Sequence, residues 1–126
     1  MRPMNERPLS PHLRIYRLPL TAILSIAHRI TGVLVLAGLV AGVACLMAAA
    51  DGSESFALIR SWLSSTMGRA FLLFWVFSMY LHLCHGLRHL IWDSGHGFAR
   101  EDLTRHAWFE LSASVVLTGL SFLLLA

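Results

Sequence analysis

The sequence contains no lysine and only two cysteines, and few of its residues are charged. Asp, Glu, Lys and Arg make up 13% of the 126 residues, whereas 56% are apolar. Cys45 and Cys84 both lie within apolar runs, so we expect neither a disulfide framework nor a zinc or redox motif. This composition excludes a disordered tail and an ordinary water-soluble domain, and it is typical of an integral membrane protein.

Arginine alone supplies the basic charge of the chain. Ten arginines stand against seven acidic residues, which gives a formal net charge of +3. A protein that binds nucleic acid needs a clustered, solvated cationic face, and a chain this apolar does not offer one. We therefore expect no nucleic-acid partner, and we interpret the arginines as signals of orientation in membrane lipid.

Three apolar runs are long enough to cross a bilayer, whose hydrocarbon core takes about 20 helical residues. Residues 30–50 carry no charge, and Pro19 is well placed for the first turn of a helix. Because backbone amides in lipid must be paired within their own segment, these runs predict helices and not strands. We expect an all-α, three-transmembrane-helix bundle in one domain, with an amphipathic tail at 1–19, spans at about 20–50, 69–93 and 107–126, and loops at 51–68 and 94–106.

The arginines predict the orientation of these spans. The tail and the second loop carry Arg2, Arg7, Arg14, Arg17, Arg100 and Arg105, whereas the opposite side carries Arg60 and Arg69. By the positive-inside bias, the N-terminus lies in the cytoplasm, or on the matrix side of a mitochondrion, and the C-terminus lies on the other side. No cleavable targeting segment is visible, so we expect a bacterial inner membrane, with a processed mitochondrial chain as the alternative.

The second span contains ionisable residues at membrane depth, where lipid should exclude them. At about 100° per residue, His82 and His89 point within about 20° of each other, and His85 lies about 60° away. His82 is the deepest, and a neutral imidazole is a good axial ligand for haem iron. Gly86, one turn further on, leaves room for a flat macrocycle. The alternative is a histidine that only hydrogen-bonds a neighbouring helix.

The other polar residues of this span have weaker interpretations. His85 is interpreted as a helix-packing residue or a partner contact. Arg88, His89 and Asp93 lie nearer the cytoplasmic end, where they are candidates for haem propionates or a proton path. Snorkelling of Arg88 to the interface and a solvated helix end at Asp93 are the alternatives.

The first span offers candidates for binding a quinone. Ser25 and Arg29 are one turn apart, with His28 beside them, near the same interface. A quinone head has two carbonyl acceptors, which a hydroxyl and a guanidinium could satisfy while the tail remains in lipid. Alternatively, Arg29 snorkels and Ser25 bonds back to its own helix.

Two stretches resemble the cytochrome b membrane-anchor subunits of succinate dehydrogenase, the succinate:quinone oxidoreductase of respiratory complex II. Residues 7–32, RPLSPHLRIYRLPLTAILSIAHRITG, contain the family pattern Ser-x-x-His-Arg-x-Ser/Thr. Residues 82–95, HLCHGLRHLIWDSG, contain His-x-x-x-Gly, then Arg-His and a closing Trp-Asp-x-Gly. Both motifs stand in the family's order and spacing.

The resemblance implies a subunit without an active site for succinate. It would anchor a flavoprotein subunit and an iron–sulfur subunit, and would complete the membrane domain with a second small anchor subunit. Haem b would lie between the two anchors with His82 as this chain's axial ligand, and His28, Arg29 and His89 would be candidates for its propionates. Electrons would reduce ubiquinone near Ser25 and Arg29.

Three alternatives remain open from the residues. The chain could be the anchor of a quinol:fumarate reductase, which shares the architecture and runs the chemistry in the opposite direction. It could be a purely structural anchor without haem. It could also be a small proton channel lined by His82 and His89. Ubiquinone, as opposed to menaquinone, follows from the family subtype and not from any residue.

Overall fold

The structure is a computed structural model that describes residues 17–125, apart from the side chains of Ser53 and Leu125. It consists of four helices: α1 (Leu20–Asp51), α2 (Ser53–Ser64), α3 (Thr66–Asp93) and α4 (Arg100–Leu125). Three of them, Leu20–Asp51, Thr66–Asp93 and Arg100–Leu124, are long and apolar enough to cross a membrane. The all-α, three-span architecture is confirmed for this part of the chain. The tail arginines Arg2, Arg7 and Arg14 lie outside the described residues.

The predicted loops are wrong in extent, because both are partly helical. Most of the first is α2, in which Phe56, Ile59 and Leu63 give an apolar stripe at helical spacing. Helix α4 begins at Arg100, and the acidic residues of its first turn favour a helix N-terminus. The third span was predicted to begin at 107, whereas α4 begins at Arg100 in polar sequence; α3 ends at Asp93, the bound given for the second span.

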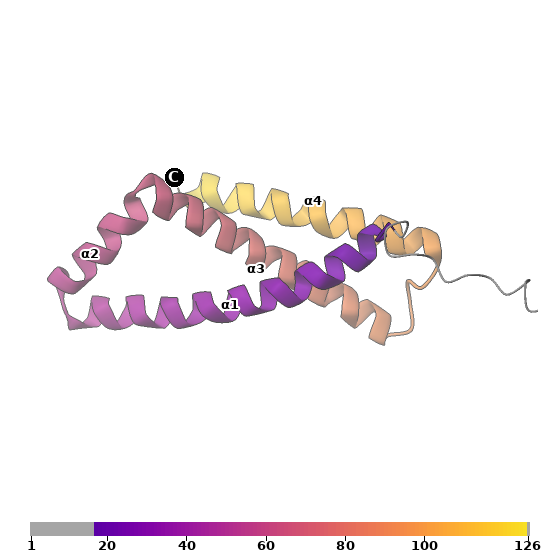
Figure 1. The fold of residues 1–126 in the computed structure, drawn as a ribbon, viewed down its shortest axis with the longest axis horizontal. Helices are drawn as coiled ribbons and strands as arrows, with labels where there is room; N and C mark the ends of the chain where they lie inside the picture. The colour runs from indigo at the N-terminus through magenta and orange to yellow at the C-terminus, as the bar shows by residue number, and fades with distance from the viewer. Residues whose placement is uncertain (1–16, 126) are drawn as a thin grey trace, which may run out of the picture.

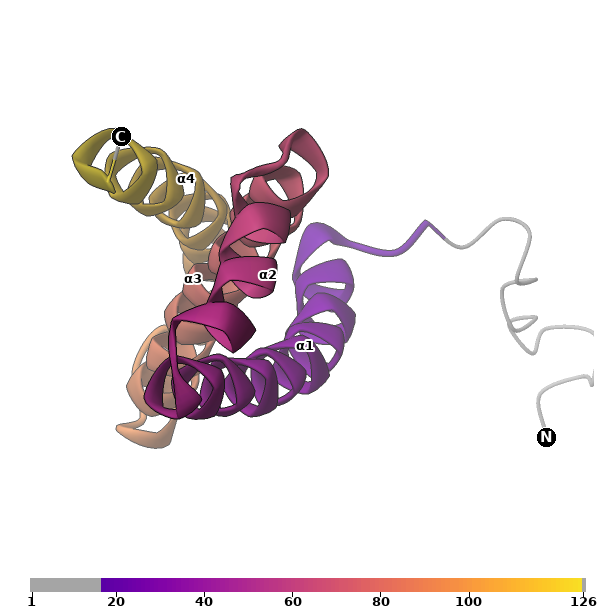
Figure 2. The ribbon, with the colours of Figure 1, turned by 90° about the vertical axis from the view of Figure 1, so that its left-hand side faces the viewer.

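Helix α3 is the centre of the fold and packs against both α1 and α4, which touch each other much less. Figures 1 and 2 show that α1 crosses α3 near the start of α1 and then diverges from it. Helix α2 bridges the gap between the far ends of α1 and α3 (Figure 1). The close contact between α1 and α3 therefore extends from the end of the bundle where α1 begins and α3 ends to about Gly38 and Trp75, near the middle of the two helices.

Small and polar residues line the contact between α3 and α4. The buried positions of α4 are Ala107, Glu110, Ser114 and Thr118, and they face Ser78, Leu81, His85 and Arg88 of α3. The hydroxyls of Ser114 and Thr118 donate to the carbonyls of Glu110 and Ser114 of their own helix at 2.6 and 2.7 Å. Small side chains let membrane helices approach closely. The interface between α3 and α4 is thus a narrow stripe of small and polar side chains that includes the buried His85, Arg88 and Glu110.

The contact between α1 and α3 also depends on a small residue that lets the two helices approach closely. The Trp75 indole donates its Nε1 proton to the Leu34 carbonyl at 3.1 Å and covers Gly38, where a side chain would overlap the ring.

A glycine cap ends α3. The amides of Gly95 and His96 donate to the carbonyls of Trp92 and Ile91 at 2.8 and 3.3 Å. This pair of bonds is a Schellman cap, and it requires the positive φ of Gly95.

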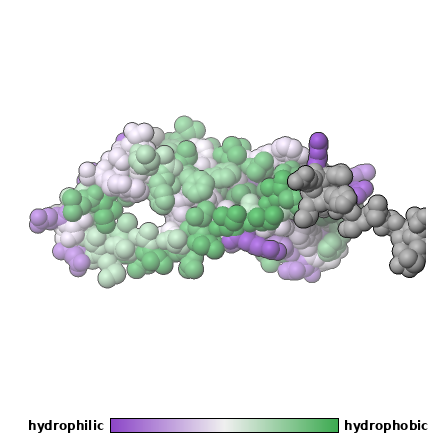
Figure 3. Space-filling view, in the orientation of Figure 1, coloured by the Kyte–Doolittle hydropathy of each residue, from purple (hydrophilic) through white to green (hydrophobic). Residues whose placement is uncertain are grey.

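Apolar side chains cover most of the outer surface. Figure 3 shows hydrophobic surface along the middle of the molecule and hydrophilic residues mainly toward its two ends. On α1 only Leu24 and Thr31 are buried, whereas Val33, Val40 and Leu46 are 68%, 65% and 72% exposed. Such an apolar surface requires lipid or another membrane subunit to cover it.

Candidate functional site

His82 of α3 lies against α1 in a fixed orientation. Its ring stacks on that of His28, with centroids 4.1 Å apart and planes 11° apart. Its Nδ1 lies 3.2 Å from the His28 carbonyl oxygen and 3.4 Å from the Thr31 hydroxyl, which itself donates to that carbonyl at 3.0 Å. Because a carbonyl oxygen can only accept, the proton of the neutral ring lies on Nδ1. The lone pair of His82 is therefore on Nε2.

Two glycines shape the surroundings of this ring. A Cβ at Gly32 of α1 would lie 3.1 Å from Cε1 of His82, so a glycine there lets α1 approach the ring closely. Gly86, one turn beyond His82, has open space where a side chain would be. The surface of α3 next to His82 is therefore bare backbone, as the sequence led us to expect.

His85, Arg88 and Glu110 form a buried polar cluster between α3 and α4. His85 Nδ1 lies 2.9 Å from Glu110 Oε1, and Arg88 donates to Glu110 Oε2 at 3.3 Å. Arg88 also donates to the Leu103 carbonyl at 2.8 Å, and its guanidinium lies 4.6 Å from the centre of the Trp92 ring. His85, Arg88 and Glu110 are 1%, 3% and 2% exposed. This cluster ties the two helices together.

His28 joins the buried cluster to His82. Its ring centroid lies 4.6 Å from that of His85 and 5.6 Å from that of His89. Nδ1 of His28 and Nε2 of His85 are both buried without a hydrogen-bond partner among residues 17–125. His89 is exposed and meets the His85 and Trp92 rings edge to face at 5.0 and 5.2 Å. Four imidazoles from two helices thus form one continuous group.

The remaining predicted residues lie at the same end of the bundle but make few contacts. Ser25 is half-buried, and Arg29 and Asp93 are exposed. In the part of the chain that the structure describes, their side chains form no hydrogen bond or ion pair with one another or with His89. Arg88 differs from these, because its donors already serve Glu110 and Leu103, which favours a structural role over contact with a propionate.

The sequence analysis missed Glu110 and Thr31 as members of the site. Glu110 is the single acid inside the third predicted span, and an acid at membrane depth needs a partner. That signal could have paired it with His85 or Arg88. Thr31 is the last position of the Ser-x-x-His-Arg-x-Ser/Thr motif, but the motif does not reveal its contact with His82, which depends on how α1 crosses α3.

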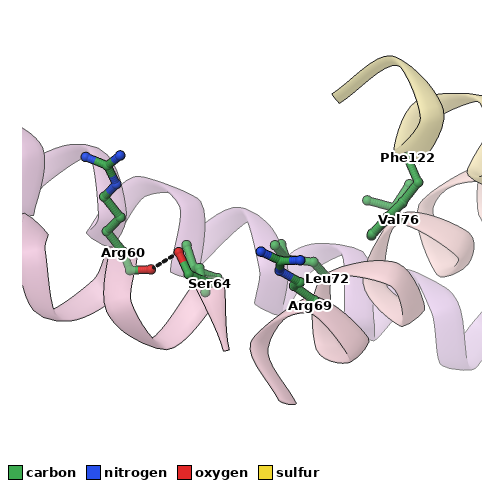
Figure 4. Close-up of a pocket in the computed structure, with 7 residues that line it drawn as sticks. Arg60, Ser64, Arg69, Leu72, Val76 and Phe122 are labelled. Carbon is green, nitrogen blue, oxygen red and sulfur yellow. Dashed lines mark hydrogen bonds between the residues drawn. The ribbon is translucent and has the colours of Figure 1, made fainter. Parts of the chain in front are cut away.

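A separate cleft of about 480 Å³ opens at the other end of the bundle, where α2 and α3 meet the end of α4 (Figure 4). Its lining is Arg60, Leu63, Ser64, Arg69, Leu72, Val76 and Phe122. The Ser64 hydroxyl donates to the Arg60 carbonyl at 2.8 Å, and both arginine side chains are exposed. Apolar walls with arginines at the rim fit a helix end at a membrane boundary. The histidine group is the stronger candidate for the functional site.

Comparison with known proteins places the chain in a family. Residues 3–121 match the family described as the succinate dehydrogenase/fumarate reductase transmembrane subunit. The chain belongs to this family. It is 41% identical over 122 residues to the succinate dehydrogenase cytochrome b556 subunit of Paracoccus denitrificans, across 94% of this chain and 91% of that protein.

Further relatives come from bacteria and from a mitochondrion. The chain is 35% identical to the succinate dehydrogenase cytochrome b556 subunit of Rickettsia typhi, across 92% of this chain and 90% of that protein. It is 36% identical to the mitochondrial succinate dehydrogenase cytochrome b560 subunit of Sus scrofa, across 89% of this chain and 68% of that protein. The resemblance inferred from the two sequence motifs is confirmed, and both motifs lie within the matched residues.

Membership in the succinate dehydrogenase/fumarate reductase transmembrane family establishes the coarse function. The chain is a membrane subunit of a multi-subunit enzyme complex, and its three helices of spanning length agree with this role. The exposed apolar face of α1 is also what a subunit of a larger membrane assembly requires.

Proposed function

We propose that this chain is the membrane-anchor and haem b-binding subunit of a succinate dehydrogenase, and that it helps to pass electrons from the iron–sulfur subunit to ubiquinone. The relatives named cytochrome b556 and cytochrome b560 subunits support the choice of haem b. The observation that carries the proposal is the orientation of His82, whose Nδ1 is held by the His28 carbonyl so that Nε2 remains available to a metal.

The residues around His82 fit one face of a haem. Nε2 of His82 would bind the iron, and the bare backbone at Gly86 leaves space for the macrocycle. Among residues 17–125, no group of three or more His, Cys, Asp or Glu side chains is arranged to hold a metal ion. A haem iron needs only one ligand from this chain, and we propose that the second anchor subunit supplies the other. Haem b, when bound, supplies a one-electron carrier beside the quinone site.

Residues near His82 are proposed to hold the haem propionates. His28 is kept as a candidate because its ring stacks on that of His82 at 4.1 Å, directly beside the proposed haem ligand. Arg29 and His89 are exposed at the same end and can supply further donors. Asp93 is exposed at the end of α3, and we keep it as a candidate for the proton path.

Ser25 and Arg29 are proposed to bind the quinone head. The Ser25 hydroxyl would donate to one carbonyl oxygen, and the Arg29 guanidinium would donate to an oxygen that gains negative charge as electrons arrive. Two electrons and two protons convert ubiquinone to ubiquinol. Neither side chain is engaged by this chain's own described residues, and the position near the end of the bundle gives the tail access to lipid.

Substitution of Arg29 tests the quinone site. We expect Arg29→Ala to lower kcat/KM for ubiquinone on the order of 10- to 100-fold, because a charged hydrogen bond contributes roughly 1.5–3 kcal/mol. The assay is succinate-dependent reduction of a short-chain ubiquinone by the whole complex. Arg60→Ala removes an exposed arginine from α2, at the other end of the bundle, and should leave this rate unchanged. Reduction of a water-soluble acceptor by the soluble subunits should be normal in both variants. A native kcat/KM for ubiquinone in Arg29→Ala, or the same loss in the control variant, would refute the assignment of Arg29.

The proposed partners follow from the position of the site. The flavoprotein and iron–sulfur subunits would dock at the arginine-rich end, where α1 begins and α3 ends, and the second small anchor subunit would cover the exposed face of α1. We propose that this end faces the bacterial cytoplasm, or the mitochondrial matrix, and that the C-terminus lies on the opposite side of the inner membrane.

A difference spectrum tests the proposed function as a whole. A strong reductant such as dithionite should reduce the purified complex fully, and the reduced-minus-oxidised spectrum should show a b-type band in proportion to this subunit. A complex that oxidises succinate without any such band would be a haem-free anchor, and the proposal would be wrong. Comparing succinate oxidation by ubiquinone with fumarate reduction by a quinol gives the direction, and a faster fumarate reaction would identify the anchor of a quinol:fumarate reductase.

A further inference from the structure

The ion pair between Arg88 and Glu110 is unusual because it is almost completely withdrawn from solvent. Their charged atoms lie 3.3 Å apart, and the side chains are 3% and 2% exposed. Charges in such a place are screened much less than charges at a surface. Each one therefore acts on neighbouring groups over a longer range than an exposed side chain would.

A chain of direct contacts links this ion pair to His82. Glu110 lies 2.9 Å from Nδ1 of His85, the His85 ring lies 4.6 Å from that of His28, and the His28 ring stacks on His82 at 4.1 Å. No described cation or acid other than Arg88 and Glu110 forms an ion pair in this region. The two charges are thus the nearest buried charges to the proposed haem ligand.

We propose that Glu110 and Arg88 act on the reduction potential of the haem held by His82 with opposite signs, so that their pairing keeps either charge from shifting it. This inference rests on the proposed function. Reduction adds one electron, so a nearby carboxylate disfavours it and a nearby guanidinium favours it. In the native pair the two effects largely cancel. Neither residue is proposed as a ligand, because the Glu110 carboxylate is engaged by His85 and Arg88; the two charges act through the field and through His85.

The test is a redox titration of the haem band in the whole complex. Glu110→Gln removes the negative charge but keeps nearly the same side-chain shape. The positive charge of Arg88 is then unbalanced, and the midpoint potential should rise. Arg88→Gln leaves Glu110 unbalanced and should lower it. A unit charge roughly 10 Å away at an effective dielectric of about 20 changes the reduction equilibrium on the order of tenfold. For one electron, tenfold corresponds to about 59 mV.

Matched variants separate charge from structure. Arg88→Lys keeps the charge and should leave the potential near the native value. Glu101→Gln removes an exposed acid from the first turn of α4 and should have no effect. The double variant Arg88→Gln with Glu110→Gln restores neutrality and should also return to the native potential. This double variant provides the comparison if a single variant does not assemble.

The outcomes distinguish this inference from the proposed function. Shifts of opposite sign in the two single variants support it, because a loosened haem pocket would move both potentials in the same direction. Unchanged potentials, shifts of equal sign, or a double variant far from the native value overturn it while the haem assignment stands. Absence of the b-type band from the native complex overturns the proposed function and this inference together.

Discussion

Replacing His82 by alanine is expected to remove the b-type absorption band from a complex that is otherwise assembled. The substitution deletes the side chain whose Nδ1 is held by the His28 carbonyl, so that its Nε2 lone pair remains free near the bare backbone at Gly86. Losing a second-shell partner of a metal ligand already lowers affinity roughly 10- to 100-fold, and losing the ligand itself should lower haem affinity by more than this. The measurement is haem content per flavin in the purified complex, together with the difference spectrum.

His89→Ala is the matched control for this substitution. It removes an imidazole from the same helix and the same end of the bundle, but His89 is exposed, and no hydrogen bond to another described residue fixes its tautomer. We expect a normal haem content with, at most, a shifted band. Imidazole added to the His82→Ala complex should restore part of the band. A band that survives His82→Ala but disappears in His85→Ala would show that the ligand assignment is wrong.

Replacing Glu110 by leucine is expected to prevent stable packing of α4. The change leaves Arg88 buried at 3% exposure with only the Leu103 carbonyl as an acceptor, and leaves His85 without a partner for Nδ1. Breaking a buried ion pair by removing one member destabilises a protein by about 3–5 kcal/mol. We expect little assembled complex, and a large fall in the thermal stability of what does assemble in detergent.

The double variant Glu110→Leu with Arg88→Met decides whether the ion pair is the reason. Replacing both members of a buried pair by apolar residues of similar size is often neutral, so most of the lost stability should return. Ser112→Leu, an exposed change on the same helix, provides a control for added apolar volume. If the double variant were as unstable as Glu110→Leu alone, the instability would come from packing and not from the unpaired guanidinium.

The number and positions of the spans could be predicted because a bilayer demands a minimum apolar length that soluble folding does not. Helix α2 could not be predicted in the same way, since its serine-rich sequence has weak helix propensity and it gains its helicity from an apolar stripe and its place between two long helices. The start of α4 was misplaced for a related reason. Charged residues end a membrane span, but they do not end a helix.

The histidines of the site could be predicted only in part. Helical spacing places His82 and His89 on one side of α3, but it does not say that His28 lies against them, because that contact depends on the crossing of α1 and α3. The rotation of α3 against α4 decides that His85 and Arg88 face Glu110, which is on another helix. Sequence reasoning thus found the residues that belong to a motif and missed the partner that binds them across an interface.

If the chain binds haem b as proposed, the hydrogen bond from His82 to the His28 backbone would link cofactor loading to the maturation of the subunit. In an α3 helix that has not yet met α1, either ring nitrogen can carry the proton and the ring is free to rotate. Only after α1 has docked against α3 does the His28 carbonyl select one tautomer and one rotamer of His82. Haem insertion would then follow the docking of these two helices during biogenesis, and a chain that has not completed this step would not capture the cofactor prematurely.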